Sequence, residues 1–281
     1  MLATTRDDET TNTGVKSMPK QAGECPSSRA ALYPRSLVIA TPHLISVPIR
    51  RPAVTLLVSL NERPFNVAVP GAGNIDTLAA LVGAGQGRVL RAGSCDLLSI
   101  NLEPGHVLFR PLQHALTERH LQSLAPAGLT GVQDLLRRCF EADVPVEPHV
   151  ESLVELCGLA GVGLDWSLRP SERVRELLAF IDAGFPEGVS LSQLADKFCL
   201  SESRLSHLFA EEVGIPLRTY LLWRRYRLAF SRLSAQSTLT RLASDSGFAD
   251  AAHLTRTFVG YFGFSPKRIL HSCFIQDLTR G

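Results

Sequence analysis

The sequence lacks the groupings of cysteine and histidine that metal and redox sites need. Its cysteines form no Cys-x-x-Cys pair, and no cysteine stands near a histidine at the spacing of zinc ligands. His43, His106 and His114 include no His-x-His pair. We therefore predict no metal, no cofactor, and reduced thiols in a reducing compartment. A redox or alkyl-acceptor cysteine is an alternative that no spacing supports. The six cysteines are Cys25, Cys95, Cys139, Cys157, Cys199 and Cys273.

Catalytic motifs are missing as well. The glycines of 71–73 and 83–87 lack the following Lys and Ser or Thr of a phosphate-binding loop. Ser190, Ser201 and Asp250 stand where helix caps are expected, which accounts for them without catalysis. We predict that the protein is not an enzyme. An enzyme with a regulatory tail is the alternative, and it would need a nucleophile and base, or a ligand cluster.

Long apolar runs and an export signal are also absent from the sequence. Residues 1–14 are acidic and polar, where a signal peptide has positive charge and an apolar stretch. No segment approaches the roughly 18 to 20 uninterrupted apolar residues of a membrane span. We expect a cytoplasmic protein with no membrane partner, and a disordered tail over 1–27.

An excess of charge of one sign is lacking too. The formal net charge is +2 and charged residues make up 20% of the chain. A near-neutral chain has no overall field that attracts nucleic acid. From residue 170 onward there are 14 Lys and Arg against 11 Asp and Glu, so only clustering of these charges makes the small excess useful.

Two copies of one pattern lie near the C-terminus, 48 to 50 residues apart. Each copy has Leu-x-x-Leu-Ala, a turn, and then a Ser or Asp placed to cap a second helix with apolar residues every three to four positions. The pattern predicts helix-turn-helix motifs over 191–212 and 239–262. Pro216 predicts a connecting helix over 217–233, and a further helix is expected over 172–182. The matched residues are Leu191, Leu194, Ala195, Ser201, Leu205, Phe209, Gly214 and Pro216, and then Leu239, Leu242, Ala243, Asp250, Leu254, Phe258, Gly263 and Pro266.

A repeated helix-turn-helix has two interpretations. One is a pair of helix hairpins in an all-α core that binds no DNA. The other is a DNA-binding domain, in which two recognition helices joined by one long helix enter successive major grooves roughly 34 Å apart. The joined repeat favours the second interpretation.

The C-terminal region resembles the DNA-binding domain of the AraC/XylS family of bacterial transcription regulators. The resemblance covers 172–270 and is strongest from Ala243 to Phe258, in Ala-Ser-Asp-Ser-Gly-Phe-Ala-Asp-Ala-Ala-His-Leu-Thr-Arg-Thr-Phe, and through Phe262-Gly-Phe-Ser-Pro266. It implies a sequence-specific regulator that binds double-stranded promoter DNA. RNA polymerase is an implied partner if the protein is an activator.

The helical pattern and the resemblance together name the DNA-binding residues. The outer face of the first recognition helix carries Arg204, and the resemblance implies base-facing positions on both recognition helices. Two alanines in the second helix offer only contacts to thymine methyl groups. Arg256 is the prime residue for a base or phosphate contact. The implied base-facing positions are Ser203, Ser206 and His207, and then Ala251, Ala252, His253, Thr255 and Arg256.

Further arginines near the helix ends and on the connecting helix are either phosphate contacts or solvated surface groups. They are Arg218, Arg224, Arg225, Arg227 and Arg241. We expect Trp223 to lie in the core and not at the DNA.

The N-terminal half predicts a sheet, which makes the fold class α+β. Short apolar runs separated by turn formers are typical of a small antiparallel barrel or sandwich. With the helices that follow, this region is similar to the cupin-like sensor and dimerisation domain of AraC-type regulators, and we assign it 28–160, with a linker over 161–171 and the DNA-binding domain over 172–281. The expected strands are 37–40, 44–49, 54–60, 65–69, 77–82, 88–90, 97–102 and 106–109, and the expected helices are 114–124, 132–142 and 150–159.

Two further partners are expected, a small-molecule effector in the barrel mouth and a second copy of the chain in a homodimer. The helices over 114–124 and 132–159 either pair between subunits or cap their own barrel. The alternative function is a ligand-binding or protein-interaction protein whose helical repeat binds no DNA, and it predicts no salt-sensitive DNA affinity.

Overall fold

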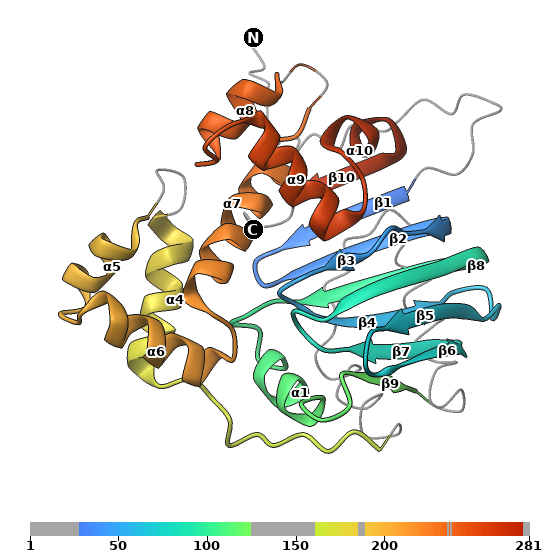
Figure 1. The fold of residues 1–281 in the computed structure, drawn as a ribbon, viewed down its shortest axis with the longest axis horizontal. Coiled ribbons are helices and arrows are strands. Elements are labelled where there is room, and N and C mark those ends of the chain that lie inside the picture. The colour runs from blue at the N-terminus through green and yellow to red at the C-terminus, as the bar shows by residue number, and fades with distance from the viewer. Residues whose placement is uncertain (1–27, 125–160, 185–188, 235, 237, 278–281) are drawn as a thin grey trace, which may run out of the picture.

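The computed structural model describes residues 28–124, 161–184, 189–234, 236 and 238–277, with strands in the N-terminal half and helices in the C-terminal half (Figure 1). The strands are β1 (Ser28–Tyr33), β2 (Ser36–Ile45), β3 (Ile49–Arg50), β4 (Val54–Ser59), β5 (Phe65–Val69), β6 (Gly73–Thr77), β7 (Ala79–Val82), β8 (Gly87–Leu102), β9 (Leu121–Ser123) and β10 (Cys273–Asp277). The helices are α1 (Phe109–Ala115), α4 (Glu172–Gly184), α5 (Leu191–Lys197), α6 (Glu202–Val213), α7 (Leu217–Ser231), α8 (Leu239–Asp245), α9 (Ala251–Phe262) and α10 (Pro266–Ser272).

The predicted combination of an N-terminal sheet region and a C-terminal helical domain is confirmed. The strands form one sheet in the order β10-β1-β2-β8-β4-β7-β9, and the 16-residue β8 also pairs with β3 and β5. All pairings are antiparallel except that of β10 with β1, which is parallel. Within the described residues β10 and β9 remain unpaired edges. The region is therefore an open sheet and not the closed barrel that we expected.

Several predicted elements have different bounds or a different type. The expected strand over 37–40 continues through Pro42 to Ile45 as β2, whereas 46–48 lie in no strand and Ile49 begins β3. β8 joins the expected strands over 88–90 and 97–102, because Gly93 does not interrupt it. Residues 106–108 form a turn, and Phe109 begins α1. The tail over 1–27 and the helices over 132–142 and 150–159 lie outside the described residues.

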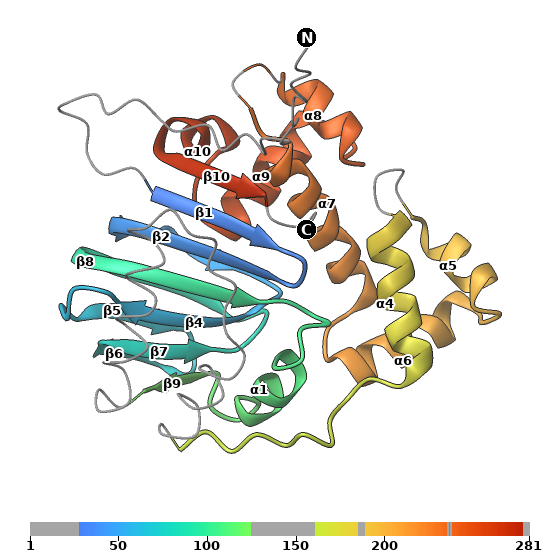
Figure 2. The same cartoon turned by 180° about the vertical axis from the view of Figure 1, so that it is seen from behind.

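Two further corrections concern segments that change type. Only the first two residues of the predicted helix over 114–124 are helical, as the end of α1, and 121–123 form β9, which pairs with β7. The C-terminal region is also not purely helical. After α10 the chain forms β10, which pairs along β1 from Ser28 to Leu32. The C-terminal region thus contributes a strand to the N-terminal sheet, as Figures 1 and 2 show.

In Figure 2, α8–α10 lie beyond β1 at one edge of the sheet, α4–α6 lie beyond the ends of the strands, and α7 lies between the two groups. α4 begins after Ser171 as predicted, and α7 spans nearly the expected range, with Pro216 as its N-cap residue and not in its first turn. Among the described helices, none is both long and apolar enough to cross a membrane.

The two faces of the sheet are buried against different helices. Val38, Leu56 and Ile100 belong to a cluster that includes α1, α4 and the buried residues of α5 and α6. Their neighbours Leu37 and Ile39 belong to a second cluster, with the buried residues of α8 and α9 and those of α7 from Trp223 onward. Because side chains alternate between the faces of a strand, each helix-turn-helix shares a buried cluster with one face. The helical region therefore does not bury a core separately from the sheet.

Gly260 and Gly263 provide a matched test of how α9 meets β3. Gly263 has a φ of 82° at the end of α9, and a Cβ atom there would lie 3.3 Å from Cγ2 of Ile49. Gly260 is exposed inside α9, and a Cβ there would meet nothing within 4 Å. We expect Gly263→Ala to lower the free energy of unfolding by about 1 to 2 kcal/mol and Gly260→Ala to raise it by about 0.5 to 1 kcal/mol. Denaturant unfolding measures both changes, and equal changes would contradict this assignment.

Candidate nucleic-acid interface

The first helix-turn-helix is α5, a turn and α6, with a side-chain cap at the start of each helix. Ser190 and Gln193 form a capping box on α5, in which each side chain accepts a backbone N–H of the other residue. The Ser201 hydroxyl accepts the backbone N–H of Arg204 at 3.2 Å, so α6 begins at Glu202. Gly214, with a φ of 88°, ends α6. The sequence pattern predicted these helix boundaries because the capping residues and the terminal glycine act on their own helices.

The second helix-turn-helix is α8, a turn and α9, and it repeats this construction. The Thr238 hydroxyl caps α8, and the Asp250 carboxylate accepts the backbone N–H of His253 at 2.6 Å to cap α9. That hydrogen bond is the main reason why the pKa of Asp250 lies below its usual value. The role of Asp250 as the N-cap of α9 therefore accounts for this residue, as the sequence predicted. The negative charge also lies at the positive end of the helix dipole.

The outer face of α6 holds the four residues that were predicted there. Ser203, Arg204 and His207 are exposed, and Ser206 is half-buried. The Ser206 hydroxyl donates to the Glu202 carbonyl at 2.8 Å, which leaves its oxygen lone pairs to accept a further hydrogen bond. Leu205 and Phe209 on the opposite face are buried. The structure thus brings the predicted α6 residues together on one solvent-facing surface.

The predicted residues of α9 differ more in exposure. Ala252 and Arg256 are exposed, whereas Ala251, His253 and Thr255 are half-buried. The His253 ring packs edge-on against Phe248, with 5.2 Å between ring centroids. The Thr255 hydroxyl donates to the Ala251 carbonyl at 2.8 Å. Among the predicted residues of α9, Arg256 is the exposed arginine.

The proposed phosphate contacts divide into exposed and buried arginines. Arg218 and Arg241 are exposed, and Arg241 lies 3.6 Å from the Asp245 carboxylate. The half-buried Arg225 packs its side chain towards Gly247, and the Arg224 Nε atom lies 3.1 Å from the Asp182 carboxylate.

For Arg227 a phosphate role is wrong. Its side chain is 5% exposed and Nη1 lies 2.5 Å from Oε2 of Glu103, whose side chain is 1% exposed. The guanidinium also donates to the carbonyl of Tyr33. Helical periodicity placed Arg227 on α7 correctly but gave no sign of the carboxylate that lies 124 residues earlier in the chain.

The connecting helix α7 holds both recognition helices through buried aromatic residues. Phe209 of α6 lies 5.4 Å from Tyr220 between ring centroids. Farther along α7, Tyr226 lies 4.9 Å from Phe258 of α9. Trp223 is fully buried, as predicted. The relative position of α6 and α9 therefore depends on the packing of α7.

Polar contacts join this helical unit to the sheet domain. Arg35, after β1, lies 2.5 Å from the Asp182 carboxylate of α4 and donates to the Tyr220 hydroxyl at 3.3 Å. Arg51, after β3, donates from Nε to the carbonyl of Tyr261 in α9 at 2.6 Å. The sequence did not predict that Arg35 and Arg51 make these contacts, because each contact joins segments far apart in the chain.

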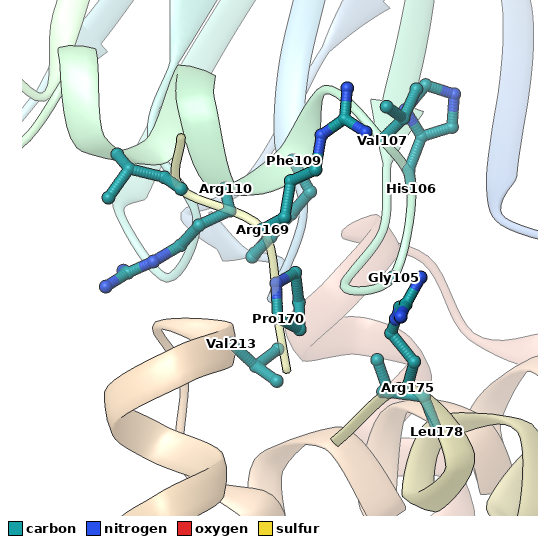
Figure 3. A pocket seen from close by; sticks show the side chains of 11 residues that line it. Gly105, His106, Val107, Phe109, Arg110, Arg169, Pro170, Arg175, Leu178 and Val213 are labelled. Atoms are coloured by element: carbon teal, nitrogen blue, oxygen red, sulfur yellow. The ribbon is translucent and has the colours of Figure 1, made fainter. Parts of the chain in front are cut away.

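A cavity of about 370 Å³ lies where α1, the segment 168–170, α4 and α6 meet (Figure 3). Arg110, Arg169 and Arg175 line it, together with apolar residues such as Phe109 and Leu178. The Arg110 guanidinium donates to the Glu211 carbonyl at the end of α6 at 2.9 Å. Arg169 and Arg175 are exposed, so water solvates their charges without a ligand.

Comparison with known proteins identifies the helical unit. A family model described as a helix-turn-helix domain matches 194–272, which spans most of both motifs. The chain is 33% identical over 100 residues to the HTH-type transcriptional activator RhaS of Escherichia fergusonii. The helical unit therefore carries a helix-turn-helix domain of the AraC type, similar to that of these transcription regulators. The match covers 34% of the chain and 35% of RhaS.

The other matches separate the AraC-type domain from the rest of the chain. An uncharacterized HTH-type transcriptional regulator of Staphylococcus aureus is 33% identical over 103 residues, 36% of the chain and 14% of that protein. The chain therefore spans well under half of these curated relatives. The crystal structure of ToxT from Vibrio cholerae aligns with 88% of the chain and 96% of its own, at a TM-score of 0.54 and 9% identity. ToxT bound to (E)-4-(8-methylnaphthalen-1-yl)but-3-enoic acid gives a TM-score of 0.55 at 10% identity, over 88% of the chain and 99% of ToxT. This likeness shows a shared two-domain fold.

Proposed function

We propose that the protein is a sequence-specific DNA-binding transcription regulator. The observation that carries the proposal is the pair of capped recognition helices, α6 and α9, held by one buried connecting helix. Both helices expose residues of the types that contact bases and phosphates, including Arg204 and Arg256. The AraC-type domain and its named relatives support the same function. Promoter DNA is the partner that we infer.

Each residue on these faces has an expected role. Ser203, Ser206 and His207 face bases from α6, with Arg204 beside them. Arg256 is the main contact from α9, and the exposed Ala252 contacts thymine methyl groups. Arg218 and Arg241 contact phosphates and so position the protein without specifying sequence. Ala251, His253 and Thr255 complete the face of α9.

An unbiased selection of bound fragments from random DNA tests this function. We expect the full chain to enrich a motif with two half-elements spaced by about one helical turn. Binding is expected to weaken steeply with salt, because phosphate contacts release counterions. No enriched motif together with salt-independent binding would favour the alternative, in which the repeat contacts protein. Duplication of the whole motif would support a homodimer.

Arg256→Ala is expected to weaken specific binding by about 1 to 3 kcal/mol and to relax sequence preference at one position, if Arg256 reads a base. Arg218→Ala is the matched control on α7. It is expected to weaken binding about equally for all sequences and to lower the salt slope by about 1. Titrations of both variants against the selected site and a scrambled site measure these effects. Equal affinity of Arg256→Ala and the unmodified protein would remove Arg256 from the interface.

We also infer that a small-molecule effector binds at the sheet domain and controls DNA binding. The support is the fold that the chain shares with ToxT, which was solved with a carboxylic acid bound. Arg35, Arg51 and Arg227 join the sheet domain directly to α4, α9 and α7. A ligand that alters the sheet domain therefore has physical contacts through which it affects the recognition helices.

A further inference from the structure

Each recognition helix ends at an arginine of the sheet domain, which comprises β1 to β9 and α1. Arg110 of α1 donates from Nη2 to the Glu211 carbonyl in the last turn of α6 at 2.9 Å. Arg51, after β3, donates from Nε to the Tyr261 carbonyl in the last turn of α9 at 2.6 Å. The last carbonyls of a helix have no partner within it and form the negative end of its dipole. A guanidinium of the sheet domain therefore stabilises the C-terminal end of both helices.

The glycines that end the two helices also lie beside the sheet domain. Gly214 and Gly263 have φ values of 88° and 82°. A Cβ atom at Gly214 would lie 2.5 Å from Nη1 of Arg110, and one at Gly263 would lie 3.3 Å from Cγ2 of Ile49 in β3. Side chains of the sheet domain are therefore placed against the end of α6 and the end of α9 in a similar way.

The first halves of both helices carry the exposed residues that we predict to read DNA. Ser203, Arg204 and His207 are exposed in the first half of α6, and Ala252 and Arg256 are exposed in the first half of α9. The two arginines of the sheet domain thus hold each helix at the end opposite its reading residues. They contact the recognition helices without belonging to the predicted DNA-binding face.

The two arginines belong to one packed body. Arg51 donates from Nη1 to Oδ1 of Asn101 in β8 at 2.8 Å, and α1, which carries Arg110, follows β8 in the chain. Phe109 of α1 is buried in the same cluster as Ile100 of β8. Close-packed buried side chains leave little room for relative movement. The sheet domain therefore fixes the distance between its two contacts with the recognition helices.

These contacts complete a ring that runs through both recognition helices. α6 packs on α7 through Phe209 and Tyr220, and α7 packs on α9 through Tyr226 and Phe258. The two arginines join α9 through the sheet domain to α6. A binding surface is held precisely only when packing fixes the elements that carry it. α7 alone attaches each recognition helix on one side, whereas the ring attaches it on two.

We propose that Arg51 and Arg110 are positioning residues that fix the distance between α6 and α9, so that the sheet domain sets the spacing between the two DNA half-elements. The inference rests on the proposed function and assigns spacing selectivity to residues that do not touch DNA. One inserted base pair moves a half-element by about 3.4 Å along the DNA axis and about 35° around it. Two helices at a fixed distance cannot follow this displacement, so one of them loses its base contacts.

The first test measures the affinity of the full chain for the selected DNA site and for sites with one base pair more or fewer between the half-elements. We expect the unmodified protein to bind the altered sites about 100-fold more weakly. In Arg110→Met this preference should fall to about tenfold, because the freed α6 can follow the displaced half-element. The ratio of affinities is the readout, because a general loss of stability or of a phosphate contact weakens binding at every spacing alike.

Matched variants separate positioning from other effects. Arg110→Lys keeps a cationic donor and should keep most of the spacing preference. Arg91→Met is the control within the sheet domain, because Arg91 is an exposed arginine of β8. Arg218→Met removes a predicted phosphate contact and should lower the affinity for every spacing without changing the ratio. Arg51→Met repeats the test at the end of α9.

A second measurement contains no DNA. Nitroxide labels on unnatural amino acids at 203 and 252, which leave the native cysteines unmodified, report the distance between α6 and α9 in the full chain by pulsed electron spin resonance. We expect one narrow distance distribution in the otherwise unmodified protein and in Arg91→Met. Arg110→Met and Arg51→Met should each broaden the distribution, because each opens the ring.

An unchanged distance distribution in both arginine variants would overturn the proposal. Tighter binding of these variants to the original site would also overturn it, because the arginines would then hold the helices in a form that binds DNA poorly. A broadened distribution in a protein that enriches no DNA motif would refute only the proposed function. Selection of two half-elements, with the same spacing preference in the variants as in the unmodified protein, would refute only the role of the two arginines.

Discussion

Arg227→Met is expected to lower the free energy of unfolding by about 3 to 5 kcal/mol. The substitution leaves the carboxylate of Glu103 buried without its cation. No other group compensates the Glu103 carboxylate among the described residues, where its Oε1 atom has no hydrogen-bond partner. The guanidinium of Arg227 also satisfies the carbonyl of Tyr33. One substitution therefore removes a charge pair and a backbone hydrogen bond that join α7 to the sheet.

Urea unfolding followed by tryptophan fluorescence measures this loss. Arg218→Met is the control on the same helix, and its change is expected to be small because Arg218 is exposed. The double variant Arg227→Met with Glu103→Met should recover much of the lost stability, since it removes both buried charges. If the single variant is as stable as Arg218→Met, the ion pair does not join the two regions energetically.

The helix-turn-helix elements were predictable from sequence because their determinants are local. Leu-x-x-Leu-Ala, a Ser or Asp cap and a terminal glycine lie within one short segment, and each acts on its own helix. Ser201 and Asp250 cap the predicted helices, and Gly214 and Gly263 end them. The same local signals placed Trp223 in the core.

The sheet was less predictable because strand pairing joins distant segments. The apolar runs predicted strands, but they did not predict that β8 continues through Gly93 or that β10 pairs with β1. The missing barrel closure depends on such long-range pairing. The segment 106–109 was mistaken for a strand because Leu108 and Phe109 are apolar and buried, but they lie in a turn and at the start of α1.

The charged residues also divide into those whose positions follow from local sequence and those whose positions depend on distant partners. Arg204 and Arg256 have exposed positions that helical periodicity implies. Arg227 and Arg51 have partners in another part of the chain, and nothing near them in the sequence distinguishes them from surface arginines. Burial of a cation is a tertiary property, so the contacts that these arginines make between the domains required the structure.

The second large effect is expected for Tyr226→Ala. Tyr226 is fully buried in the middle of an aromatic cluster that joins α7 to α9. Its ring centroid lies between 4.9 and 5.8 Å from five others, those of Trp223, Phe230, Phe258, Tyr261 and Phe262. Removal of a buried aromatic ring costs about 3 to 5 kcal/mol through lost burial and the cavity that remains.

The position of this cavity gives Tyr226→Ala a consequence beyond stability. Loss of the ring loosens α9 on α7, while the contact of Phe209 with Tyr220 still holds α6. We therefore expect the folded variant to keep the half-element read by α6 and to lose that read by α9, as footprinting on the selected DNA would show. Tyr226→Phe keeps the ring and is expected to keep both half-elements. Equal loss of both half-elements in folded Tyr226→Ala would show that α7 positions the recognition helices as one unit.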